Sequence, residues 1–219
     1  MEILYEDNHL LVVNKPINMP VQQDESNDPD LLNTLKLYLK EKYNKPGNVY
    51  LGLVHRLDRP VGGIMVFAKT DKAASRLFKD MQQNKFQKEY LAVVCGQPQQ
   101  YAELRNYLSK NHQTNTVSVT NAQKGKLAVL EYETIERKEE LSLVKIKLHT
   151  GRSHQIRVQM ANANLPLWGD QRYNKNAKIG QQIALFAYKL SFPHPISKET
   201  MTFCYQPKNI KPFNLFNMR

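Results

Sequence analysis

The strongest constraint on the fold is a succession of strand-like segments in the second half of the chain. The clearest is 141–148, in which Val144 and Ile146 alternate with Lys145 and Lys147. Successive side chains of a strand point to opposite faces, so this alternation predicts a sheet with one buried face and one solvated face. Similar patterns predict further strands at 88–95, 117–120, 127–134, 184–192 and 199–205.

Three helices are expected to interrupt these strands. The first has Asp30 as its N-cap and carries apolar residues spaced four apart, namely Leu31, Leu35, Leu39 and Tyr43. The second begins at Thr70 or Asp71, with one face formed by Ala74, Leu77, Phe78 and Met81. The third begins near Ser153 and ends before the proline at 166. Long strand stretches punctuated by a few helices predict an α+β fold, with a mostly antiparallel, mixed sheet flanked by helices.

The first half of the chain adds two shorter strands. An apolar run at 8–14 predicts one, which ends at Lys15 because the proline that follows cannot donate to a sheet ladder. The pair Gly62-Gly63 is expected to make a tight turn before an apolar strand at 64–68.

The chain is strongly basic. Its 219 residues include 31 Lys and Arg against 20 Asp and Glu, a net charge of +11, which favours a polyanionic partner such as nucleic acid or an acidic membrane surface. It has no run of about 18 apolar residues and no secretory signal, so we expect a cytoplasmic protein. No linker, repeat or low-complexity segment divides it, and we expect a single domain of residues 1–219.

Cysteine and histidine are too scattered for a zinc site. Cys95 and Cys204 have no Cys-x-x-Cys spacing and lie in apolar, strand-like surroundings, which predicts buried, reduced thiols. The six histidines form no i, i+4 pair with a nearby carboxylate. We therefore expect no metal.

Two short stretches concentrate ionisable side chains. The first, His-Arg-Leu-Asp-Arg-Pro-Val-Gly-Gly at 55–63, is a loop before a buried strand. Taken alone, Asp58 could be a surface acid paired to Arg56 or Arg59. The second, Thr-Gly-Arg-Ser-His-Gln-Ile-Arg at 150–157, lies where a strand ends and a helix begins, and taken alone it could bind an adventitious anion or cap a strand end.

Together these stretches resemble the RluA family of RNA pseudouridine synthases, and the resemblance extends from about Ile3 to about Phe203. Several motifs carry it in the same order. They are Leu-Tyr-Glu-Asp at 4–7 with Val-Asn-Lys-Pro at 13–16, His-Arg-Leu-Asp at 55–58, Ala-Lys-Thr at 68–70, Lys-Glu-Tyr at 88–90, Gly-Arg-Ser-His-Gln-Ile-Arg at 151–157, and Leu-Ser-Phe-Pro-His-Pro at 190–195. The resemblance implies the pseudouridine synthase fold with a central RNA-binding cleft.

The resemblance also implies an isomerase that detaches uracil from its ribose in RNA, rotates the base and rejoins it through carbon, without a cofactor. It assigns the catalytic carboxylate to Asp58, acting as nucleophile or as base. A guanidinium keeps a nearby carboxylate ionised, and Arg157 matches the family residue with that role. We therefore expect an ion pair between Asp58 and Arg157.

Tyr90 is implied to stack on the target base and to help remove the proton from carbon 5. The residues alone leave the alternative of a core tyrosine. The target nucleotide must be flipped out of the RNA, at about a few kcal/mol, and Arg56 resembles the residue that fills the vacated stack. His55 is expected to order the loop. Other expected RNA contacts are basic side chains, namely His55, Arg59, Lys88, Lys124, Lys126, Arg152 and His154.

The sequence departs from the family pattern at several places. Val61-Gly62 stands where the family more often has Thr-Ser, which removes two hydroxyls from the catalytic loop. Asn18 replaces a glycine but also accepts the left-handed conformation, and Phe186 stands where histidine is common. Many relatives carry an N-terminal S4-type RNA-binding domain, which we do not expect here because the catalytic opening starts a few residues after Met1.

The expected substrate is therefore a stem-loop of transfer or ribosomal RNA, bound by the catalytic domain of a monomer. The alternative is a catalytically silent RNA-binding module or RNA chaperone that keeps the fold. That alternative predicts RNA binding that survives Asp58→Ala, and no pseudouridine formed by the wild type.

Overall fold

The computed structural model describes residues 2–218, which form two compact units. The first unit contains residues 2–87 and 189–205, and the second contains residues 88–188 and 206–218. Strand β10 (Leu185–Pro193) begins in the second unit and ends in the first. The prediction of a single domain concerns the whole chain and stays a prediction.

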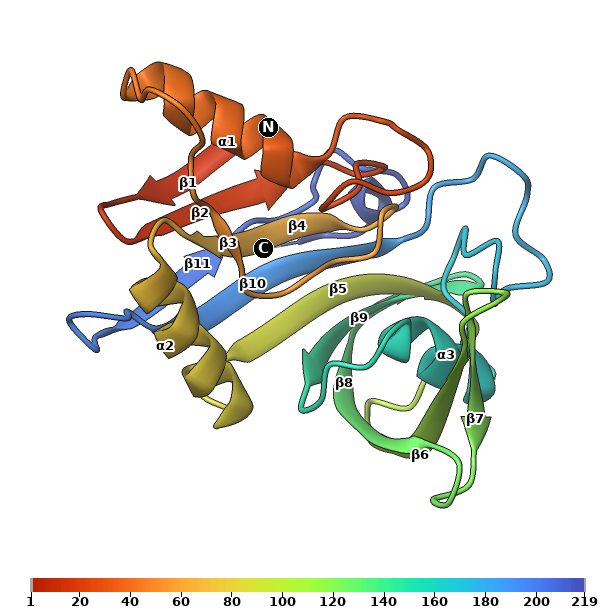
Figure 1. Cartoon of the computed structure of the whole chain (residues 1–219). Coiled ribbons are helices and arrows are strands. Elements are labelled where there is room, and N and C mark those ends of the chain that lie inside the picture. Colours follow the sequence, from red (N-terminus) through yellow and green to blue (C-terminus); the bar gives the residue numbers. More distant parts are fainter. Residues whose placement is uncertain (1, 219) are drawn as a thin grey trace. The chain divides into compact units, whose positions relative to one another are not determined.

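The first unit is built on a sheet in the order β1–β2–β4–β10, with β3 paired to β4 and β11 to β10 (Figure 1). Its other strands are β1 (Glu2–Glu6), β2 (Leu10–Lys15), β3 (Gly52–Leu53), β4 (Gly62–Ala68) and β11 (Thr200–Cys204). Strands β2 and β4 are antiparallel, and their register places Lys15 opposite Gly63. The predicted strands at 8–14, 64–68 and 199–205 are confirmed.

Two helices cover this sheet. They are α1 (Leu31–Lys42) and α2 (Asp71–Gln82), and both predicted N-caps are confirmed, because Asp30 accepts from the backbone N–H of Asn33 and Thr70 from that of Ala73. Helix α2 packs Ala73 and Leu77 against one face of β2 and β4. Alternate residues of both strands are also buried, and α1 lies on that other side (Figure 1). Because both faces of β2 and β4 are covered, the two strands consist of nearly continuous apolar residues.

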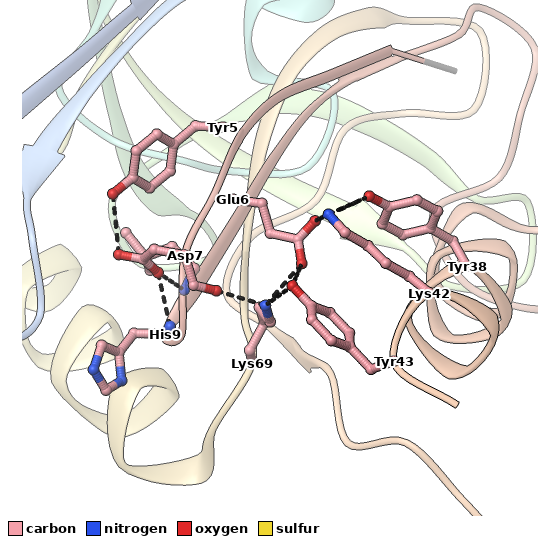
Figure 2. Close-up of polar contacts among 9 residues, drawn as sticks. Tyr5, Glu6, Asp7, His9, Tyr38, Lys42, Tyr43 and Lys69 are labelled. Atoms are coloured by element: carbon pink, nitrogen blue, oxygen red, sulfur yellow. Dashed lines mark hydrogen bonds and ion pairs between the residues drawn. The ribbon is translucent and has the colours of Figure 1, made fainter. Parts of the chain in front are cut away.

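Helix α1 is held to the sheet by the buried carboxylate of Glu6 on β1 (Figure 2). Glu6 accepts hydrogen bonds from Lys42 at 2.7 Å, Tyr43 at 2.6 Å, Lys69 at 2.8 Å and Tyr38 at 3.0 Å. Burial alone raises the pKa of Glu6, but these four donors outweigh it and lower the pKa to about 2. The cluster therefore ties α1 to the ends of β1 and β4.

The second unit contains an antiparallel sheet in the order β5–β9–β8–β6–β7. Its strands are β5 (Gln87–Cys95), β6 (Tyr101–Asn111), β7 (Thr116–Thr120), β8 (Lys126–Lys138) and β9 (Leu141–Leu148). Helix α3 (Gln155–Asn162) lies in the hollow of the curved strands β6 to β9 (Figure 1), and a short 3₁₀ helix spans Phe213–Leu215. The α+β class with a mostly antiparallel sheet is confirmed.

Several local predictions are wrong. Gly62 and Gly63 lie within β4, and the turn precedes them. Phe78 of α2 is 51% exposed, because the buried face runs through Ala73, Leu77 and Asp80 instead. Cys95 and Cys204 are free thiols as predicted, but Cys204 is exposed and Cys95 only half-buried.

Residues 2–218 contain neither a membrane-spanning helix nor a preformed metal cluster. None of the helices in this range is long and apolar enough to cross a membrane. No group of three or more His, Cys, Asp or Glu side chains in this part of the chain is arranged to hold a metal ion.

Candidate active site

Asp58 lies in the loop that joins β3 to β4 in the first unit. The neighbouring Leu57 is buried, and the backbone N–H of Val61 donates to the carbonyl oxygen of Asp58 at 2.9 Å. His55 accepts a hydrogen bond on Nε2 from the backbone N–H of Val66 in β4, at 3.2 Å. The apolar anchor, the tight turn and the His55 contact fix the loop on both sides of Asp58, in agreement with an ordering role for His55.

A buried lysine, which the sequence interpretation missed, supports the same loop. The ammonium of Lys15 donates to the carbonyl oxygens of Pro16 at 2.8 Å, Met19 at 2.7 Å and Arg59 at 3.1 Å. Burial lowers the pKa of Lys15 to about 7, the charge of Asp58 acts in the opposite direction, and Arg59 adds to the lowering. Lys15 therefore joins the end of β2 to the residue that follows Asp58. Its place before a proline at the end of an apolar strand was the available signal.

Arg59 points toward an acidic loop of the same unit. Its guanidinium donates to Ser26 Oγ at 2.8 Å, pairs closely with Asp28, and lies 3.5 Å from Asp24. These pairs are largely solvent-exposed and contribute little stability. Arg59 was predicted to contact RNA, and in this structure its charge is compensated by that loop. Arg56 is exposed.

In the second unit, Arg157 of α3 is buried and bound side-on by Asp170. The guanidinium Nε donates to Asp170 Oδ2 at 2.9 Å and Nη2 to Oδ1 at 2.8 Å. Asp170 is almost fully buried, and its Oδ1 also accepts from the backbone N–H groups of Arg172 and Tyr173. Asp170 uses two of the five N–H donors of Arg157. It therefore fixes the plane of the guanidinium.

Sequence reasoning missed Asp170, although its preceding glycine was a signal. Gly169 has φ +72, and a Cβ at this position would overlap the carbonyl oxygen of Gln182. Only glycine fits such a close approach in the left-handed region. Gly169 therefore allows the chain to turn so that Asp170 faces Arg157.

Tyr173 connects Arg157 to the start of α3. The Arg157 guanidinium carbon lies 5.2 Å from the Tyr173 ring centre, within cation–π range. The Tyr173 hydroxyl accepts from the backbone N–H of Val117 at 2.9 Å and lies 2.8 Å from His154 Nδ1. Burial raises the pKa of Tyr173, although the Val117 bond and the charge of Arg157 oppose the rise. His154, a predicted RNA contact, thus has one ring nitrogen on Tyr173.

The other predicted residues of the second unit lie on or beside the sheet. Tyr90 is in the middle of β5, opposite Ile146, with 8% of its surface exposed. Lys88 lies two residues before it, and burial lowers the pKa of Lys88. Arg152 is exposed, and its Nε donates to the carbonyl oxygen of Leu127 at 2.9 Å.

The predicted site residues thus fall into two groups. The first unit contains Asp58 with Arg56, His55 and Arg59, and the second contains Tyr90, Lys88, Arg152, His154 and Arg157. The ion pair between Asp58 and Arg157 would join the two units, and it stays a prediction.

Comparison of the sequence with models of known protein families identifies the class of protein to which this fold and these residues belong. The family model described as RNA pseudouridylate synthase matches residues 9–162, a range that includes Asp58, Tyr90 and Arg157. The chain therefore belongs to the RNA pseudouridylate synthase family, which confirms the family predicted from the sequence motifs. Pseudouridylate synthases are isomerases that act on RNA, so the predicted class of enzyme is confirmed as well.

Individual relatives agree with this assignment. The chain is 34% identical over 215 residues to the ribosomal large subunit pseudouridine synthase D of Zymomonas mobilis subsp. mobilis, covering 93% of this chain and 68% of the relative. It is also 34% identical over 216 residues to the protein of the same name from Pasteurella multocida, covering 92% and 65%. The chain thus spans about two thirds of the length of these relatives.

A solved structure supports the fold. The human RNA pseudouridylate synthase domain containing 4 superposes with a TM-score of 0.79 at 20% identity, and the match covers 94% of this chain and 88% of the human chain.

Proposed function

We propose that this chain converts uridine to pseudouridine in RNA, with Asp58 as the catalytic carboxylate. The observation that carries the proposal is the position of Asp58, on a turn held by a buried lysine and a buried leucine inside the range matched by the family model. Holding a reacting group in one geometry lowers the entropic part of an activation barrier. A carboxylate on such a turn suits chemistry better than a freely moving surface acid does.

The proposed reaction exchanges one bond of the nucleotide for another. The bond between N1 of uracil and C1′ of ribose breaks, the base rotates, and a bond forms between C5 and C1′. C5 then loses its proton, and N1 gains one. The atoms therefore balance without an oxidant, a reductant or a cofactor.

Three side chains have roles in this proposal. Asp58 acts on the ribose as nucleophile or base. Arg157, whose orientation is fixed by Asp170, keeps the Asp58 carboxylate ionised and close to the sugar. Tyr90 offers an aromatic ring for stacking and a hydroxyl near C5 when the proton leaves.

The proposed substrate is a uridine in ribosomal RNA of the large subunit, as the names of the two relatives indicate for those proteins. A base in a folded RNA must leave its stack to reach a carboxylate, at about a few kcal/mol, and an unpaired loop nucleotide leaves most easily. Arg56 is exposed and suited to fill the vacated space. Action as a monomer in the cytoplasm belongs to the same proposal.

The test uses ribosomal RNA transcribed with tritium at C5 of uridine. Since C5 exchanges its hydrogen for the bond to C1′, each turnover releases one tritium to water. The proposal predicts release by the wild type and none by Asp58→Asn, which keeps the shape of the side chain. RNA binding without release by the wild type would instead support the catalytically silent RNA-binding module.

A further inference from the structure

The positive charge of the protein is concentrated in the second unit. The segments 88–188 and 206–219 contain 17 of the 31 Lys and Arg but only 8 of the 20 Asp and Glu. The remaining segments contain 14 and 12, which nearly cancel. A polyanion is therefore attracted mainly to the second unit.

One face of the sheet in this unit largely neutralises itself. The strand register places Glu133 opposite Lys145 and Glu131 opposite Lys147, on the side away from α3. The ammonium of Lys145 lies 2.7 Å from Glu133. On the same side, Arg105 pairs with an acid two residues before it, at 3.2 Å. This face offers little uncompensated charge to a ligand.

The opposite face, toward α3, presents lysines without acids. Lys110 is opposite Val117 and Lys126 is opposite Leu108. Val117 and Leu108 pack with Val158 of α3 in one apolar cluster. Directly paired residues point to the same side of a sheet, so both lysines project on the α3 side, where both are exposed. Neither forms an ion pair within residues 2–218.

Two arginines from outside the strands donate to backbone carbonyl oxygens at or beside the ends of the same strands. Arg152 donates from Nε to the carbonyl oxygen of Leu127, next to Lys126. Arg172 donates from Nη1 to the carbonyl oxygens of Thr114 and Asn115 in the turn between β6 and β7. Bonds to neutral carbonyls orient a guanidinium but leave its charge uncompensated. We call the four side chains Lys110, Lys126, Arg152 and Arg172 the α3-side basic surface.

The α3-side basic surface adjoins the proposed catalytic arginine. Arg172 is the chain neighbour of Tyr173, whose ring stacks on Arg157 and whose hydroxyl holds Val117 in β7. Figure 1 shows α3 beside β6, β7 and β8. Of these strands, β6 carries Lys110 and β8 carries Lys126. Phosphates bound there would belong to nucleotides close to the one at Arg157.

We infer that the α3-side basic surface binds the RNA backbone next to the target uridine, while the charged groups on the other face of the sheet do not. The inference rests on the proposed function for the identity of the polyanion. It assigns RNA contacts to Lys110 and Arg172 in addition to two residues expected from the sequence, Lys126 and Arg152. Arg59, whose charge is compensated by its own loop, is not part of this surface.

The test compares two double variants that remove the same charge. Lys110→Gln/Lys126→Gln changes the α3-side basic surface, and Lys145→Gln/Lys147→Gln changes the neutralised face. Binding of a short stem-loop RNA is measured at a series of salt concentrations, with Asp58→Asn in each protein to prevent turnover. Thermal unfolding of each variant serves as the control for correct folding.

Each phosphate contact contributes about 0.7 to 0.9 to the slope of log affinity against log salt. The first double variant should therefore lose about 1.4 to 1.8 of that slope. Over the tenfold range between about 1 M and 0.1 M salt, this loss makes its binding at 0.1 M salt roughly 25- to 60-fold weaker than that of the parent. The second should bind within about twofold of the parent, because its lysines lie beside glutamates. Equal effects of both variants, or no effect of the first, would overturn the inference.

Failure of the proposed function is recognised separately. With Asp58 restored, the wild type and the Lys145→Gln/Lys147→Gln variant are assayed for tritium release at low salt and saturating RNA, where both should turn over at similar rates. If no protein releases tritium while the first double variant still loses its salt slope, the enzyme proposal fails and the RNA-binding surface stands. If the wild type releases tritium and the slope is unchanged, the RNA-binding surface fails and the enzyme proposal stands.

Discussion

Replacing Asp170 tests whether a buried ion pair orients Arg157. In Asp170→Asn, the oxygen equivalent to Oδ1 can still accept from Arg157 Nη2 and from two backbone N–H groups. The amide group at the Oδ2 position would face the Nε–H of Arg157, which is also a donor. The variant thus loses one charge-assisted hydrogen bond and the carboxylate charge beside a buried guanidinium. Removing one partner of a buried pair costs about 3–5 kcal/mol, and since one oxygen remains we expect about 3 kcal/mol.

The assay is urea unfolding of the wild type, Asp170→Asn, Arg157→Met and the double variant. Residues that form one pair couple, so the double variant should be about 2 kcal/mol more stable than the sum of the single losses implies. Glu133→Gln serves as the matched control, because its pair with Lys145 is exposed and should cost less than about 1 kcal/mol. Additive losses within about 0.5 kcal/mol would refute the coupling of Asp170 to Arg157.

Three further predictions concern stability. The folded pKa of Glu6 is about 2, below its ordinary 4.5, so its contribution is complete above pH 4.5 and lost as pH falls toward 2; acid titration of stability should show a smaller drop in that window for Glu6→Gln. The folded pKa of Lys15 is about 7, below 10.5, so the unfolded chain holds more protons between these values, and the wild type should gain stability relative to Lys15→Met as pH rises through that window. Gly169→Ala should lower the free energy of unfolding by about 2 kcal/mol or more, measured by thermal unfolding. The control Gly180→Ala has a similar φ of +79 but open space around it, and it should lose about 1 kcal/mol. Equal losses would contradict the role of the Gln182 contact.

Much of the fold followed from the sequence, because periodicity reports burial. Strand 141–148 was predicted with its observed bounds, and both helix N-caps were correct. Strand β6 (Tyr101–Asn111) was missed, because its outward residues are polar and its only buried side chain is Leu108. Phe78 was placed in the core because hydrophobicity alone does not specify which side of a helix meets the sheet.

The supporting residues of the site were harder to predict than the motif residues. Lys15 and Asp170 act through contacts with residues far along the chain or across a turn, so their neighbours in the sequence give little indication of their partners. A lysine normally lies in solvent, and three carbonyl oxygens that replace water make its burial possible. Such long-range compensation appears only when the chain is folded.

The central claim is that the chain makes pseudouridine through Asp58. The most direct measurement maps pseudouridines in the total RNA of three strains: one with the gene, one without it, and one in which Asp58→Asn replaces the wild type. We expect at least one site, in ribosomal RNA of the large subunit, to be present in the first strain and absent from the other two. The claim is contradicted if no site disappears on deletion, or if the Asp58→Asn protein restores the lost site.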